Sequence, residues 1–195
     1  YLPAFDEGCT QQLAEVQEIL NTPGAATFEN TIVALEKSGQ KLMRMLLVFY
    51  NKSSSDTSDA LDAIEEEMAP KLAAHQDAIQ LNPVLFKRIK DLYDARESIG
   101  LNIEDSWLLE RYYKDLIHAG AHLTEAQRDR LKELNEELSK LETQFGKNVL
   151  ADTNDLAVLV DSLEELDGLS ENEIAAAAAA ANDRGHDGKW LIGMV

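Results

Sequence analysis

The sequence is poor in cysteine, and long apolar runs are missing from it. Cys9 is the only cysteine among 195 residues, which excludes an internal disulfide and a cysteine-rich zinc site. No stretch approaches the roughly 20 apolar residues that a membrane-spanning helix needs, and no secretory signal peptide opens the sequence. We therefore expect no membrane partner and a cytoplasmic location.

Basic residues are scarce compared with acidic ones. The chain has 18 Lys and Arg residues against 36 Asp and Glu residues, so its formal net charge is -18. Such a charge repels a nucleic-acid backbone and attracts cationic peptides at long range. We therefore expect no nucleic-acid partner. A solvated acidic surface without a specific ligand explains the same charge.

Signatures of common active sites are also missing. The sequence has no Gly-x-Ser-x-Gly motif, no phosphate-binding loop and no dinucleotide fingerprint. Only His118 and His122 have the i, i+4 spacing that lets two imidazoles bind zinc from one helix. The residues between them include no glutamate general base, and Gly120 indicates a helix end. We therefore predict no catalytic and no metal-binding residue, and the residues that contact a substrate stay undetermined.

The remaining candidate groups have structural explanations. His75 lies on an apolar helical stripe, where a hydrogen-bonded core histidine is expected, and His186 lies in a glycine-rich turn. Cys9 would be a nucleophile only beside a histidine and an orienting group, and no such residues are near it in the sequence. None of the three is therefore assigned a chemical role.

Helical periodicity is the main feature that the sequence does have, and it is longest over residues 123–151. Apolar residues recur there at steps of three or four: Leu131, Leu134, Leu138, Leu141, Phe145 and Val149. Thr124 and Gln127 have the spacing of a capping box at the start of this helix. About 28 helical residues span roughly 42 Å. We expect the preceding segments to cover the apolar stripe along its whole length.

Shorter helices are predicted before this long one. They cover 6–21, a bent or kinked pair over 27–51 that is weakened at Ser38-Gly39, 61–79 with Pro70 inside it, 82 to about 100, and 102–118. Residues 52–59 consist of Lys, Ser, Thr and Asp with no apolar side chain, which predicts a loop.

The pattern changes after residue 151. We predict a strand at 156–160, a helical turn at 163–166, a helix after the Ser170 and Glu173 capping box, and a second strand at 189–192 that pairs with the first. The predicted fold is mainly α: an elongated antiparallel helical bundle with kinked long helices, plus a small C-terminal α/β tail with a short two-stranded ribbon. The predicted domains are 1–151 and 152–195.

Several strings in the sequence resemble one known family. They are Thr27–Ile32, Glu67–Leu72, Leu81–Pro83 with Leu85-Phe86, Leu109–Tyr113 followed by Ala119–Ala121, and Leu134–Leu138 with Thr143–Phe145. In this order they are similar to the amino-terminal region of the M3 (thimet oligopeptidase-like) zinc metallopeptidases. Within that family they most resemble the bacterial peptidyl-dipeptidase (dipeptidyl carboxypeptidase) branch. The resemblance covers nearly the whole chain.

The resemblance implies a function for a longer parent protein. Family members bind one zinc ion through His-Glu-x-x-His and a downstream glutamate in a carboxy-terminal catalytic domain, and none of these residues has a match here. The resemblance implies that this amino-terminal part forms a helical wall of the substrate channel. We therefore expect an inactive fragment of a cytoplasmic zinc peptidase that releases C-terminal dipeptides from oligopeptides. Its expected partners are those substrates and its own catalytic domain.

The two ends of the chain agree with a fragment, since it begins with Tyr1 and not Met and stops just after the second predicted strand. Two alternatives stay open. One is a stand-alone acidic helical module that binds basic segments. The other is an endo-oligopeptidase of the same family, which would differ only in residues outside this chain.

Overall fold

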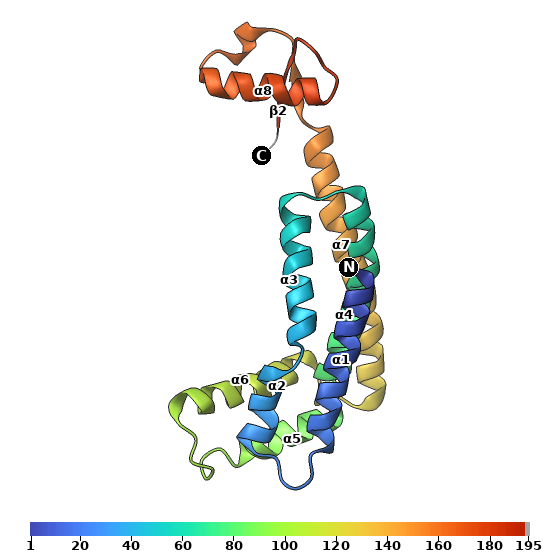
Figure 1. Cartoon of the computed structure of the whole chain (residues 1–195), viewed down its shortest axis with the longest axis vertical. Helices are drawn as coiled ribbons and strands as arrows, with labels where there is room; N and C mark the ends of the chain where they lie inside the picture. The colour runs from blue at the N-terminus through green and yellow to red at the C-terminus, as the bar shows by residue number, and fades with distance from the viewer. Residues whose placement is uncertain (194–195) are drawn as a thin grey trace. The chain divides into compact units, whose positions relative to one another are not determined.

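A computed structural model describes residues 1–193, and the final Met194 and Val195 lie outside the described residues. The mainly α fold with a two-stranded ribbon is confirmed (Figure 1). Its elements in chain order are α1 (Leu2–Asn21), the π-helical turn η1 (Glu29–Val33), α2 (Ala34–Lys37), α3 (Gln40–Ser55), α4 (Asp59–Gln80), α5 (Pro83–Asp94), α6 (Ile103–Ala119), α7 (Glu125–Asp155), β1 (Val158–Val160), the 3₁₀ turn η2 (Leu163–Leu166), α8 (Glu171–Asp183) and β2 (Trp190–Ile192). They form two compact units, Tyr1–Thr143 and Gln144–Val195.

Capping residues set the helix starts that the sequence predicts. At α7, the Thr124 backbone N–H donates to Gln127 Oε1 over 3.0 Å, and the Gln127 N–H donates to Thr124 Oγ1 over 3.4 Å. At α8, Ser170 and Glu173 form the same reciprocal box. Each pair satisfies backbone donors that the first turn of a helix leaves without partners. Both predicted capping boxes are therefore confirmed.

Several helix boundaries differ from the prediction, and α7 runs to Asp155 and not to residue 151. Helix α1 begins at Leu2 and not at Asp6, because a proline at the first turn, here Pro3, fits a helix start. The predicted loop 52–59 is wrong in its first half, since α3 continues to Ser55. Its Ser53 hydroxyl donates to Glu65 Oε2 of α4 over 2.9 Å, a tertiary contact that local composition does not reveal. Helix α5 ends at Asp94, and turns replace the helix predicted up to about residue 100.

Two hydrophobic cores hold the first unit together, and α1 contributes to both. The first core lies between α1, the η1 and α2 segment, α5 and α6, and its fully buried members include Ile32, Ile89 and Leu109. The second lies between α1, α3 and α4, around Phe49 and Met68. Helix α4 continues through Pro70, as predicted.

Helices α1 and α3 approach closely because residue 8 is glycine. A Cβ atom at Gly8 would lie 2.9 Å from the Cα of Leu42, which is shorter than van der Waals contact. The backbone of α3 therefore occupies the space of the missing side chain. The buried Gly8 is a packing requirement of the second core.

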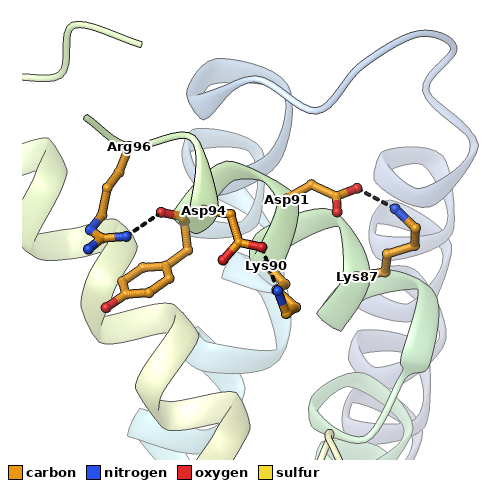
Figure 2. A network of polar contacts seen from close by, with 6 residues as sticks. Lys87, Lys90, Asp91, Asp94 and Arg96 are labelled. Carbon is orange, nitrogen blue, oxygen red and sulfur yellow. Dashed lines mark hydrogen bonds and ion pairs between the residues drawn. The ribbon is translucent and has the colours of Figure 1, made fainter. Parts of the chain in front are cut away.

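Helix α5 has ion pairs on its exposed face, and Arg96 follows its C-terminal end (Figure 2). Lys87 pairs with Asp91 and Lys90 with Asp94, each over 2.5 Å and one helical turn apart. Such exposed pairs contribute only about 0.3–0.5 kcal/mol each. The guanidinium of Arg96 donates to the Tyr93 carbonyl over 2.8 Å and lies 4.2 Å from that ring centroid. It stabilises the turn that ends α5.

The second unit is built around the ribbon. Strands β1 and β2 pair antiparallel, with Val158 opposite Ile192 and Val160 opposite Trp190, so the predicted pairing is confirmed. Helix α8 lies against β2, and its Ala181 is fully buried. Small alanine side chains permit this close approach.

The expectation that earlier segments cover the apolar stripe of α7 is wrong. No residue of α7 is buried. Exposed fractions along the stripe are 44% for Leu134, 53% for Leu138, 60% for Leu141 and 70% for Phe145. Periodicity predicts a helix and its apolar face, but only the tertiary arrangement decides which way that face points.

Replacing Gly8 with alanine should destabilise the chain, because the new methyl group meets the α3 backbone. We expect a loss of about 1–3 kcal/mol in the free energy of unfolding, measured by urea denaturation. The matched control is Gly146→Ala, a helical glycine with no atom within 4 Å of the new Cβ. It should gain about 0.5–1 kcal/mol from helix propensity. Equal effects at the two sites would contradict the packing argument.

Candidate functional site

A polar junction lies between the two cores, where α2 and α3 are separated. Ser38 has an extended conformation and Gly39 a φ of 72°, so the helix breaks there as the sequence suggests. Two residues of α1 contact Gly39 at this break. Glu15 Oε2 accepts from the Gly39 N–H over 2.7 Å, and a Cβ at residue 39 would lie 2.3 Å from Gln12 Nε2. The positive φ favours glycine at this position, and a larger residue would also displace the Gln12 amide.

His75 of α4 joins this junction through Gln12. Its Nε2 lies 2.7 Å from Gln12 Oε1, and because an amide oxygen only accepts, the imidazole donates from Nε2. His75 is 6% exposed, and its Nδ1 has no hydrogen-bond partner among the described residues. Burial lowers the pKa of His75, which favours the neutral ring. The prediction of a hydrogen-bonded core histidine is confirmed, with Gln12 as the partner of Nε2.

Two adjoining pockets open at this junction, with volumes of about 470 and 390 Å³. They share five lining residues: Gln12, Glu36, Ser38, Ile79 and Gln80. The Tyr112 hydroxyl donates to Glu36 Oε1 over 2.7 Å. Burial and this carboxylate raise the pKa of Tyr112, so its hydroxyl stays protonated. The pockets offer amide, hydroxyl and carboxylate groups for binding polar molecules, without an activated nucleophile.

A second polar cluster explains the first string of the family resemblance. Arg88 of α5 donates from Nε to Thr31 Oγ1 over 2.9 Å and from Nη2 to Asn30 Oδ1 over 2.8 Å. Asn30 and Thr27 also exchange hydrogen bonds between side chain and backbone. Because Thr31 is fully buried, Arg88 satisfies a hydroxyl that water does not reach. These residues hold the π-helical turn to α5 and have a structural role.

Cys9 and His75 line one pocket of about 420 Å³, a proximity that the sequence does not indicate. A cysteine nucleophile needs a thiolate, usually stabilised by an imidazolium ion. Here burial, and next the Asp6 carboxylate, raise the pKa of Cys9, while burial lowers that of His75. Both shifts favour the neutral forms, so the pair is not an activated nucleophile.

The structure separates the two histidines with metal-ligand spacing. Helix α6 ends at Ala119, Gly120 adopts a left-handed conformation with a φ of 97°, and His122 follows in a turn. His118, His122 and His186 are all exposed. Within residues 1–193, no three His, Cys, Asp or Glu side chains group together to hold a metal ion. The residues of the described part therefore do not fit a zinc site.

The sequence does not single out Gln12 of the polar junction or Arg88 of the second polar cluster. Each is a polar residue at helical spacing on an otherwise apolar stripe, Gln12 between Phe5 and Val16, and Arg88 between Leu85 and Leu92. That pattern is a usable signal, because a polar group on a buried face needs a partner on another element. It does not identify the partner.

The chain is similar along its whole length to known peptidases. It is 40% identical over 195 residues to the dipeptidyl carboxypeptidase of Escherichia coli (strain K12) and 38% identical to that of Salmonella typhimurium. These matches cover all of this chain and 29% of each relative. The oligopeptidase A of Escherichia coli is 25% identical over 190 residues, which are 97% of this chain and 28% of that protein. No family model matches the chain.

Among the described residues, no helix has the length and apolar character to cross a membrane.

Replacing Gln12 with methionine should destabilise the junction, because it removes the acceptor of His75 Nε2–H at similar side-chain size. A buried donor without a partner costs about 1–3 kcal/mol, and thermal or urea unfolding measures the loss. Gln17→Met is the control on the exposed face of α1, with an expected change below about 0.5 kcal/mol. Similar losses in both variants would show that Gln12 has no special role.

Adding Zn²⁺ or a chelator to this chain should shift its melting temperature by less than about 1 °C, since a ligand stabilises a fold only by binding it. Differential scanning fluorimetry measures the shift. A rise of several degrees with Zn²⁺ that disappears in the His118→Ala/His122→Ala double variant would instead establish a metal site at that pair.

Proposed function

We propose that the chain belongs to the M3 peptidase family and is the non-catalytic amino-terminal part of a zinc-dependent peptidyl-dipeptidase. The parent enzyme releases dipeptides from the carboxyl end of short peptides, and this segment limits which substrates enter. The zinc ion and the groups that hold it belong to a part of the polypeptide outside this chain.

The observation that carries the proposal is the difference in identity between the two kinds of relative. Identity is 40% to a dipeptidyl carboxypeptidase and 25% to an oligopeptidase A, over nearly the same residues. The difference supports the exopeptidase branch over an endo-oligopeptidase. Since the chain spans 29% of the first relatives, most of a polypeptide of that length remains to supply the catalytic groups.

The role in substrate access is supported by what the first unit contains. It is a set of helices around two cores, with pockets lined by both apolar and polar side chains and no activated nucleophile among those described above. We propose that residues 1–151 form a channel wall and that residues 152–195 lead into the catalytic part. The net charge of -18 favours the approach of cationic peptides at low ionic strength.

The test uses the natural full-length polypeptide and a series of N-terminally acetylated peptides of 4, 8, 12 and 20 residues. We expect release of C-terminal dipeptides, detected by mass spectrometry, with kcat/KM falling at least about tenfold for a folded protein with a free carboxyl end. Peptides with an amidated carboxyl end are the control, and their cleavage should be much slower.

Each other result identifies a different function. Internal cuts, with amidated peptides cleaved equally well, would favour the endo-oligopeptidase. A natural polypeptide of 21.6 kDa that cleaves nothing but binds basic peptides with a steep salt dependence would favour the acidic binding module. Equal cleavage of folded and short substrates would leave the peptidase in place but remove the role in access.

A further inference from the structure

The first unit has an exposed apolar stripe on α7. Leu134, Leu138 and Leu141 are 44%, 53% and 60% exposed, and they follow one another along a single face. A contiguous exposed apolar patch on a folded unit marks an interaction site more often than chance. We call these three residues the leucine seam.

After the half-buried Leu131, the side of α7 that the unit covers is polar. Asn135, Ser139 and Thr143 are half-buried, at steps of four residues. Asn135 Nδ2 donates to Asp77 Oδ1 of α4 over 2.8 Å, and Asp77 is 7% exposed. Burial raises the pKa of this carboxyl, an effect that the Asn135 hydrogen bond and Lys132 partly offset. Helix α7 is therefore attached to its own unit by hydrogen bonds, and its apolar seam points elsewhere.

The spacing of the seam indicates the shape of its partner. Apolar residues occur at 131, 134, 138, 141 and 145, alternating steps of three and four. This is the period of 3.5 with which one helix packs along another. A second helix that lies along α7 with its own apolar stripe would bury all three leucines together.

Charge argues against a second copy of this chain as the partner. Glu137 and Glu142 flank the seam on its two sides, and a paired copy would bring the same carboxylates against them. Two chains of net charge -18 also repel each other as they approach. A partner helix with Lys or Arg beside its apolar stripe has the complementary charge.

We propose that the leucine seam of α7 docks a helix from the catalytic part of the same polypeptide, with basic residues flanking the apolar stripe of that helix. The proposal rests on the proposed function, in which the chain is part of a longer enzyme. It is supported by the 29% coverage of the relatives, because the remaining length is sufficient to supply such a helix. The docked helix would fix the channel wall to the catalytic part.

Site-specific photo-crosslinking in the natural full-length polypeptide tests the docking. Leu141→p-benzoylphenylalanine places the reactive group in the seam. Glu133→p-benzoylphenylalanine is the control, since the Glu133 side chain is 67% exposed on another face of the same helix. We expect the crosslink from residue 141 to map to a helix outside residues 1–195, with at least about tenfold less product from residue 133.

Mixing isotopically light and heavy protein separates crosslinks within one chain from those between copies. A link from residue 141 to a second copy, a link to residues 1–143, or no link at all would each overturn the docking. Dipeptide release is assayed separately on the unmodified protein. If the link maps outside the segment but no dipeptides are released, the proposed function fails and the docking stands. If dipeptides are released but residue 141 forms no link outside the segment, the docking fails and the proposed function stands.

A stability comparison gives a second readout. Leu138→Gln/Leu141→Gln should leave the melting temperature of the 195-residue chain within about 1 °C, because both side chains are exposed there. In the full-length protein the same change should lower the melting temperature by about 2–4 °C, since the leucines are buried against the docked helix. Equal shifts in the two proteins would contradict the docking.

Discussion

The first unit depends on one helix that packs into two cores. Helix α1 buries Phe5 in the core with α3 and α4, and Val16 and Ile19 in the core with α5 and α6. Between them, Gln12 accepts the hydrogen bond of His75 and packs on Gly39, where the chain breaks from α2 to α3. Because apolar contacts are nondirectional, this polar junction is what determines how the two cores are joined.

The buried polar groups of the first unit are engaged in hydrogen bonds within the unit. Its buried polar groups bond mainly to one another, as Arg88 does to Asn30 and Thr31, so they stabilise turns and leave no reactive group poised. Burial raises the pKa of Cys9 and lowers that of His75, and both shifts favour the neutral, unreactive forms.

Much of the fold was predictable because local rules decide it. Neighbouring residues were sufficient to predict the caps at Thr124 and Ser170, the apolar period of the helices and the strand β1. One error arose where a residue of another helix contributes, since Ser53 at the end of α3 donates a hydrogen bond to Glu65 of α4. The others are local: Pro3 lies in the first turn of α1, and Arg96 bonds to the Tyr93 carbonyl three residues earlier at the end of α5.

The sequence by itself determined the mainly helical fold, the acidic surface and the existence of an apolar face on α7, and it showed the resemblance to one peptidase family. These follow from composition, period and ordered motifs, which are local properties of the chain. Only the tertiary structure decided that α7 turns its polar side toward α4 and leaves its leucines exposed. The physical reason is that periodicity defines which residues share a face but contains no information about the surface that this face meets.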